Sequence, residues 1–190
     1  MCKQPQTVSF TLPGWVRDFS ADIPSGMSVE QRMAIVIEAA RQNVLRRTGG
    51  PFAAAVFEIN SGKLVALGVN LVTTQGLSML HGEMVALSLA QRERNTWNLG
   101  EDVAHELVTS TEPCAMCLGA VCWSGVTRVV SGASEADARA LGFDEGPKPE
   151  NWQLELQQRD IEVIPEILRD DAVKVLQAYR QQGGVVYNSR

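Results

Sequence analysis

The sequence predicts an α/β fold, a three-layer α/β/α sandwich around one mixed five-stranded sheet. Three observations lead to this prediction. Five apolar runs of strand length alternate with helix-length segments in the order α-β-β-α-β-α-β-α-β-α. Two of the helical segments are apolar on nearly every side, as is typical of buried helices. The chain has 190 residues, which is enough for a single domain with a full core.

The first third of the chain predicts an arm, a helix and a hairpin. Residues 1–27 contain three prolines, so we expect an irregular N-terminal arm. A capping-box pattern at Ser28 predicts a helix start, and Gly49 is expected to follow the end of that helix. Two apolar runs, at 53–59 and 63–69, flank a short Asn-Ser-Gly turn and predict two mostly buried strands.

Helices and strands are expected to continue over the rest of the chain. Helices are predicted at 81–94, 114–123, 135–141 and 170–182, and strands at 106–110, 127–131 and 161–167. Pro165 marks the last strand as an edge strand or as one that ends early. Residues 142–152 contain two prolines and are expected to form a loop. The organisation predicted is one domain over 28–182 with a C-terminal tail at 183–190.

Composition and charge narrow the classes of function. No apolar run approaches about 20 residues, so we expect no transmembrane helix and no membrane partner. The N-terminus lacks the apolar core of a signal peptide, and four cysteines do not form a disulfide framework, so the cytoplasm is the expected compartment. The net charge is −5, and no basic cluster exceeds the pair Arg46-Arg47, which argues against a nucleic-acid partner.

The chemistry is expected at His81-Gly82-Glu83 and at the later Cys114-Ala115-Met116-Cys117. One histidine and two cysteines give three protein ligands, the number found in a catalytic zinc site that leaves its fourth position to water. We therefore expect one Zn²⁺ per chain on His81, Cys114 and Cys117, with Glu83 as the proton carrier. The pattern H-x-E…P-C-x-x-C is the signature of zinc nucleobase deaminases.

Two other interpretations of the cysteine pair are half of a structural zinc site and a redox pair. A structural site needs a fourth protein ligand, and only Cys2, Cys122 and His105 remain as donors. A redox pair would need neither a histidine nor a glutamate. Glu83 alone is also explained as a carboxylate that complements a helix N-terminus. The combined spacing favours the catalytic site.

Further segments resemble the cytidine deaminase-like superfamily, and within it the bacterial guanine deaminases. They are Gly49-Gly50-Pro51-Phe52-Ala53-Ala54, Asn70-Leu71-Val72-Thr73-Thr74, the block from Thr111 to Ala120, Trp123, and Gly142-Phe143-Asp144-Glu145. The resemblance spans residues 49–146. It implies a cytidine deaminase-like fold, a small nucleobase substrate, hydrolytic deamination of guanine to xanthine with release of ammonia, and a homodimer. The related guanine deaminases exchange their C-terminal segments between subunits, which implies the same for the tail here, with Gly183-Gly184 as the hinge and Val185-Val186-Tyr187 as the docking element. A frayed tail is the alternative.

The resemblance also implies roles for single residues. A catalytic role, with contact to the purine and proton transfer, is implied for Glu145. Substrate-binding positions are implied at Asn70, Phe52, Ala54, Trp123 and Asp144. The alternatives are ordinary core aromatics for Phe52 and Trp123, a turn residue for Asn70, and a solvated loop face for the acidic pair.

One departure from the family leaves the substrate open. The family usually has His-Ala-Glu where this chain has His81-Gly82-Glu83. We expect the missing methyl group to enlarge or loosen the floor of the pocket. Another amino-heterocycle, such as an aminotriazine, cytosine or a nucleoside, is the main alternative substrate. A tRNA adenosine deaminase is disfavoured by the missing basic patch, and a non-catalytic zinc-stabilised binding protein by the intact Glu83.

Overall fold

The computed structural model describes residues 3–188; residues 1–2 and 189–190, which include Cys2 and the end of the tail, lie outside the described part. One sheet of five strands in the order β2-β1-β3-β4-β5 forms the centre. The strands are β1 (Ala53–Glu58), β2 (Leu64–Val69), β3 (His105–Thr111), β4 (Arg128–Ala133) and β5 (Glu162–Ile164). β1 runs antiparallel to β2 and β3, whereas β3, β4 and β5 are parallel, so the predicted mixed sheet is confirmed.

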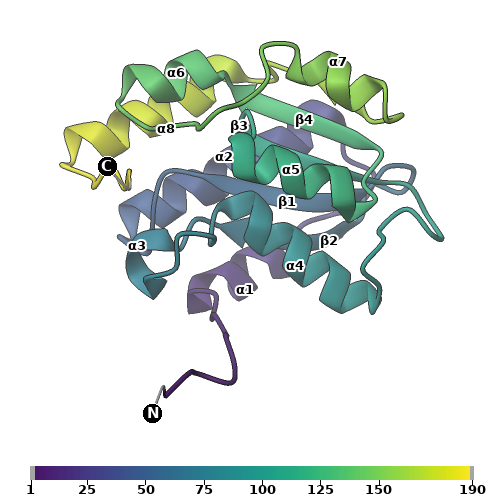
Figure 1. Ribbon diagram of the computed structural model, residues 1–190, viewed down its shortest axis with the longest axis horizontal. Helices are drawn as coiled ribbons and strands as arrows, with labels where there is room; N and C mark the ends of the chain where they lie inside the picture. The colour runs from purple at the N-terminus through teal and green to yellow at the C-terminus, as the bar shows by residue number, and fades with distance from the viewer. Residues whose placement is uncertain (1–2, 189–190) are drawn as a thin grey trace.

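Helices cover both faces of this sheet (Figure 1). One face carries α2 (Val29–Leu45) and α8 (Arg169–Gln181). The other carries α4 (Gly82–Arg94), α5 (Ala115–Ser124) and α7 (Trp152–Gln157). The buried apolar side chains form two clusters, one on each side of the sheet. The predicted three-layer sandwich is therefore confirmed. No helix in the described range 3–188 is long and apolar enough to cross a membrane.

Short helices occupy segments that we expected to be loops. α1 (Gly14–Ala21) lies in the arm that we expected to be irregular, with Val16 buried and Trp15 Nε1 donating to Thr48 Oγ1 at 3.1 Å. α3 (Val72–Gln75) forms one turn in the loop before α4. α7 (Trp152–Gln157) follows the loop predicted at 142–152 and lies where no element was predicted. The expectation failed because helices this short show too few turns for an apolar period to appear in the sequence.

Other local predictions are confirmed. Ser28 Oγ accepts the backbone N–H of Gln31 at 3.3 Å while Gln31 Oε1 accepts that of Ser28 at 2.8 Å, which is a capping box. A second capping box starts α6 (Glu135–Ala140) at Ser134. β5 is an edge strand of three residues that ends directly before Pro165.

The packing of α4 on the sheet corrects our expectation for Gly82. A Cβ at Gly82 would lie 3.0 Å from the Cα of Ala53, so the missing methyl group faces strand β1 and not the floor of a pocket. The same contact requires Gly68, where a Cβ would lie 2.4 Å from the backbone nitrogen of Ala86. Glycine at both positions lets α4 lie close on the sheet, which places the N-terminus of α4 beside that of α5.

Candidate metal centre and active-site pocket

The structure brings His81, Cys114 and Cys117 together where two helices begin. His81 is the N-cap residue of α4, Cys114 is the N-cap of α5, and Cys117 lies in the first turn of α5. His81 Nδ1 is 3.5 Å from Cys114 Sγ and 3.6 Å from Cys117 Sγ. The three ligand atoms lie within 4.8 Å of one another. This separation allows a single metal ion to contact all three.

The protonation chemistry of the group fits a metal site. A hydrogen bond from Cys117 lowers the pKa of the Cys114 thiol to about 4, and contact with His81 adds to the effect. The same hydrogen bond, together with burial, raises the pKa of Cys117. A preformed thiolate is the form that binds metal, and a helix N-terminus favours it.

The donor set also fits the ligand count of a catalytic zinc. Within the described residues, no other histidine, cysteine or acidic residue joins the group. His105 is instead buried, with its Nδ1 2.6 Å from the carbonyl oxygen of Leu99. One histidine and two cysteines leave a fourth position of a tetrahedral zinc free for water or substrate, which disfavours a structural site.

A cavity of about 200 Å³ opens beside the group. His81, Cys114, Glu83 and Glu145 contribute to its wall, together with the aromatic rings of Phe52, Phe143 and Tyr187. Phe52 and Phe143 meet edge to face with ring centroids 4.9 Å apart. The remaining lining residues are Val72, Ser78, Thr111, Glu112, Asp144 and Asn188. Flat apolar walls with a few polar groups suit a small planar ring.

Two buried carboxyl groups reach this cavity from different segments. Glu83 lies in the first turn of α4, and burial raises its pKa to about 7, with a further rise from Cys114. Glu145 lies in the loop after α6, and burial raises its pKa to about 8, with further rises from Cys114 and Glu83. A carboxyl whose pKa lies near neutral pH can take up and release protons during a reaction.

The other predicted substrate contacts fall into two groups. Phe52 and Asp144 line the cavity, although Asp144 Oδ1 accepts the backbone N–H of Gly146 at 2.9 Å and stabilises its own turn. Asn70 and Ala54 are fully buried and do not line the cavity. The Oδ1 of Asn70 accepts the backbone N–H of Val72 at 3.2 Å, and its Nδ2 has no partner within the described residues.

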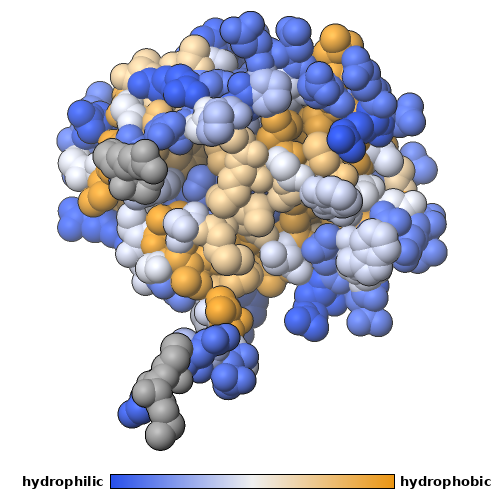
Figure 2. Space-filling view, in the orientation of Figure 1, coloured by the Kyte–Doolittle hydropathy of each residue, from blue (hydrophilic) through white to orange (hydrophobic). Residues whose placement is uncertain are grey.

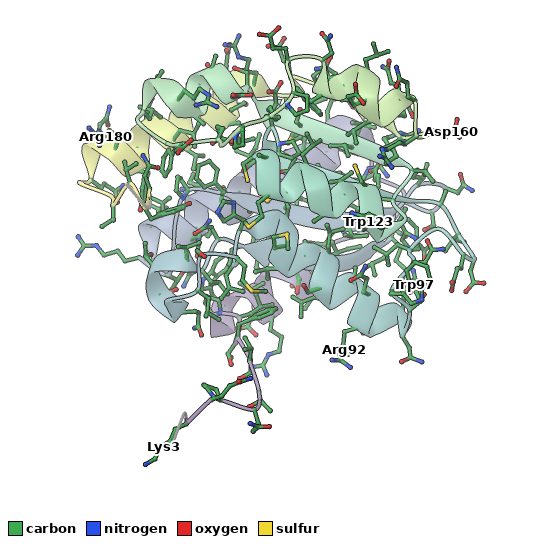
Figure 3. All side chains as sticks on the ribbon, viewed as in Figure 1. Lys3, Arg92, Trp97, Trp123, Asp160 and Arg180 are labelled. Atoms are coloured by element: carbon green, nitrogen blue, oxygen red, sulfur yellow. The ribbon has the colours of Figure 1, made fainter. Side chains whose placement is uncertain are left out.

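The structure does not bring Trp123 to the cavity. It is 81% exposed on the outward face of α5, and Figure 3 places its side chain at the far end of that helix from the cysteines. We expected α5 to be buried on all sides, but Met116 is exposed as well. Only Cys117, Leu118, Val121 and Ser124 of this helix are buried in the single chain. Figure 2 shows the apolar surface that results over α5.

Tyr187 is a lining residue that the sequence did not identify. The tail folds back so that its ring lies edge to face with Phe143 at 5.4 Å and with His81 at 6.3 Å between centroids. Asn188 fixes this position, because its Nδ2 donates to the carbonyl of Gly142 at 2.8 Å and its Oδ1 accepts the N–H of Asp144 at 3.0 Å. The glycine pair Gly183-Gly184 followed by Val185-Val186-Tyr187 indicates a docking segment. This pattern does not indicate which surface of the protein the segment contacts.

Comparisons with known proteins agree with this site. Residues 27–133 match the family described as the cytidine and deoxycytidylate deaminase zinc-binding region. The guanine deaminase of Bacillus subtilis is 34% identical over 119 residues, which is 63% of this chain and 73% of that protein. A structure solved in complex with 2,6-diaminopurine is 46% identical over 96% of this chain and 97% of that one, with a TM-score of 0.89. The guanine deaminase structure from Nitrosomonas europaea is 44% identical over 94% and 98% of the two chains, with the same TM-score.

Proposed function

The chain belongs to the cytidine and deoxycytidylate deaminase zinc-binding family, and we propose that it hydrolyses free guanine to xanthine and ammonia. The observation that carries the proposal is the small cavity in which Glu83 and Glu145 lie beside His81, Cys114 and Cys117. Likeness over nearly the whole chain to a structure with 2,6-diaminopurine bound supports a purine base as the ligand.

We propose that His81, Cys114 and Cys117 hold one zinc ion per chain. A zinc ion there supplies a Lewis acid that makes water nucleophilic near neutral pH. Glu83 takes one proton from the attacking water on its carboxylate oxygen and gives it to the ring nitrogen beside the amino-bearing carbon. It then takes the second proton, from the hydroxyl group now bonded to that carbon, and gives it to the amino group, which leaves as ammonia as the carbonyl forms. Burial of Glu83, which brings its pKa to about 7, suits both directions of this transfer.

Size and hydrogen bonding favour a free purine base. The volume of about 200 Å³ is below the roughly 300–1,000 Å³ typical of sites for drug-sized ligands, so a base fits better than a nucleoside. Guanine presents N–H donors along one edge, and the Glu145 carboxyl, which lines the cavity, would accept from them. A buried acceptor disfavours ligands that leave it unpaired, often by about 1–3 kcal/mol.

A panel of amino-heterocycles with ammonia release as the readout tests this function. We expect guanine to be turned over well ahead of cytosine, adenine, aminotriazines and the corresponding nucleosides. Faster turnover of cytosine or a nucleoside would reject guanine as the substrate while keeping the deaminase. Activity on tRNA alone would indicate an adenosine deaminase. Absence of turnover on the whole panel, with zinc bound, would favour a binding protein.

We also propose a homodimer formed through α5. Met116, Gly119, Ala120 and Trp123 are spaced i, i+3, i+4 and i+7, so they form one stripe on the outward face of the helix. An apolar stripe at the surface is typical of a protein interface. Light scattering should therefore give a dimer, and Trp123→Glu should shift it to a monomer. Leu45→Glu, at an exposed leucine on the opposite face of the sheet, serves as the control.

Exchange of the tail (residues 183–190) between subunits stays a prediction. In the single chain, Tyr187 of the tail lines the cavity of the same subunit. Mixing Glu83→Gln subunits with Tyr187→Ala subunits tests the exchange. With exchanged tails, the site of the Tyr187→Ala subunit keeps its own Glu83 and receives Tyr187 from the other subunit, so one complete site forms per mixed dimer. A reducing compartment such as the cytoplasm is proposed as well, since the motif cysteines must stay reduced to bind metal.

A further inference from the structure

Lys148 carries a positive charge that is enclosed within the protein near the proposed active site. Its side chain is only 2% exposed. The Nζ lies 2.8 Å from Glu135 Oε2 and 3.3 Å from Glu112 Oε2, and 4.8 Å from the centre of the Trp152 ring. Buried lysines are rare and need charged partners, because removing the ammonium group from water is costly. The paired carboxylates explain how this one is tolerated.

The loop that carries Glu145 and Lys148 is hydrogen-bonded to the chain on both sides of Cys114. Lys148 Nζ donates to the carbonyl oxygen of Pro113 at 3.3 Å. Three residues earlier in the same loop, the carbonyl oxygen of Glu145 accepts the backbone N–H of Ala115 at 2.9 Å. The loop that carries Glu145 is therefore attached to the residue before Cys114 and to the residue after it.

Arg139 completes the arrangement from helix α6. Its Nε lies 2.6 Å from Glu135 Oε1, and its Nη2 donates to the carbonyl oxygen of Gly146 at 3.1 Å. The positive charges of Lys148 and Arg139 thus balance the negative charges of Glu112 and Glu135. These four side chains connect three segments, namely the turn after β3, helix α6 and the Glu145 loop. Lys148, which itself lies in the Glu145 loop, contacts both of the other segments.

We propose that Lys148 is a positioning residue that fixes the Glu145 carboxyl relative to Cys114. Lys148 does not line the cavity, so it acts through the loop. The activity part of this inference rests on the proposed function. A displacement of about 1 Å in a reacting group can lower a rate by about 10²-fold, which is why the attachment of this loop matters.

Steady-state kinetics on guanine with Lys148→Met and Lys148→Arg test the inference. Methionine keeps an unbranched side chain of similar length but removes the charge, and with it the ion pairs and the contact with the Trp152 ring, so kcat should fall by up to about 10²-fold as the Glu145 carboxyl shifts. KM should change less than kcat, because the proposed Glu145 contact with the purine is shifted and not removed. Arginine keeps the charge and should recover most of kcat. Lys174→Met, at an exposed lysine paired with Asp171, is the matched control.

Hydrogen exchange measured by mass spectrometry gives a readout that does not depend on turnover. In Lys148→Met, segments 112–118 and 142–148 should exchange faster than in the wild type, with zinc content unchanged. Glu135→Gln should give a smaller change in the same direction, and it decides the question if Lys148→Met does not fold.

The outcomes separate this inference from the proposed function. If the wild-type protein does not deaminate guanine, the function fails, and the exchange experiment still tests the role of Lys148. Wild-type kcat and exchange in Lys148→Met overturn the inference, as does an equal loss in the methionine and arginine variants. Loss of zinc together with activity in Lys148→Met also overturns it, because Lys148 would then act on metal retention.

Discussion

The phenol oxygen of Tyr187 fills the space that a side chain at Gly50 would need, since a Cβ at Gly50 would lie 2.7 Å from it. Gly50 lies in the loop between α2 and β1 and Tyr187 lies in the tail, so this loop and the tail meet beside the cavity. Gly184 fixes the path of the tail in the same way, because a Cβ there would lie 2.5 Å from the Tyr179 ring. The Oη of Tyr179 donates to the carbonyl of Val185 at 2.7 Å.

We therefore predict that Gly50→Ala displaces Tyr187 from the cavity. The KM for guanine should rise by about 10-fold, which corresponds to about 1.4 kcal/mol of binding free energy. Zinc content should stay unchanged, because Gly50 does not contact the metal ligands. Gly14→Ala is the control, since a Cβ at Gly14 meets nothing within 4 Å. An unchanged KM in Gly50→Ala would show that the Tyr187 ring does not contribute to base binding.

The second prediction concerns the metal. Elemental analysis should find one zinc per chain, and Cys117→Ala should lose most of it, because a three-ligand site cannot spare one ligand. The melting temperature should fall in parallel, since metal binding stabilises the folded state. Cys122→Ala, on the same helix but outside the group, should retain zinc. Full zinc occupancy in Cys117→Ala would remove that residue from the ligand set.

The third prediction is that Glu83→Gln retains fold and zinc but loses turnover. Glutamine has nearly the same shape but cannot carry a proton, so kcat should fall by about 10²–10⁴-fold. Glu93→Gln, on the exposed surface of the same helix, is the matched control. A rate close to the wild type in Glu83→Gln would exclude the proposed proton carrier.

The fourth prediction concerns Glu145. Glu145→Gln should cut guanine turnover strongly while zinc content stays the same, because a carboxyl that can take up and release a proton beside the purine is replaced by an amide that cannot. Asp144→Asn should have a smaller effect, since Asp144 is exposed and its carboxylate already accepts from Gly146. Equal turnover of guanine by Glu145→Gln and the wild type would argue against guanine as the substrate.

The fifth prediction concerns stability against pH. Two hydrogen bonds from Arg169, at 2.8 and 2.9 Å, hold the pKa of Asp137 well below its usual range. A pKa lowered in the folded state stabilises the protein above the unfolded pKa of about 3.9, and this stabilisation is lost as the pH falls through the folded value. Arg169→Met should therefore lower the urea midpoint at about pH 7, and the difference from the wild type should shrink towards about pH 2.

The surface pair of Arg17 and Asp18 supplies the control for this experiment. Its side chains are 89% and 79% exposed and 3.6 Å apart, so Arg17→Met should leave the urea midpoint unchanged at both pH values. A midpoint difference for Arg169→Met that is the same at both pH values would contradict the assigned role of Asp137.

Local sequence patterns determined the sheet, the long helices and the metal-ligand group. The capping box at Ser28 and the early end of β5 before Pro165 depend only on neighbouring residues, so they could be predicted and are confirmed. His81, Cys114 and Cys117 could be predicted to converge because their spacing places each at the start of a helix, where donor atoms of one short segment face the same way.

Only the tertiary structure decided what surrounds this group. Tyr187 reaches the cavity, and Lys148 reaches Pro113 beside Cys114, from segments outside both motifs, and no local period or spacing marks such contacts. Trp123 shows the opposite case, since its position in the motif suggested a pocket wall while the rotation of α5 on the sheet turns it outward. The local sequence determines which side chains lie at the start of a helix. Which partners they contact depends on how the helix packs against the sheet, and a single glycine such as Gly82 determines how closely α4 can lie on β1.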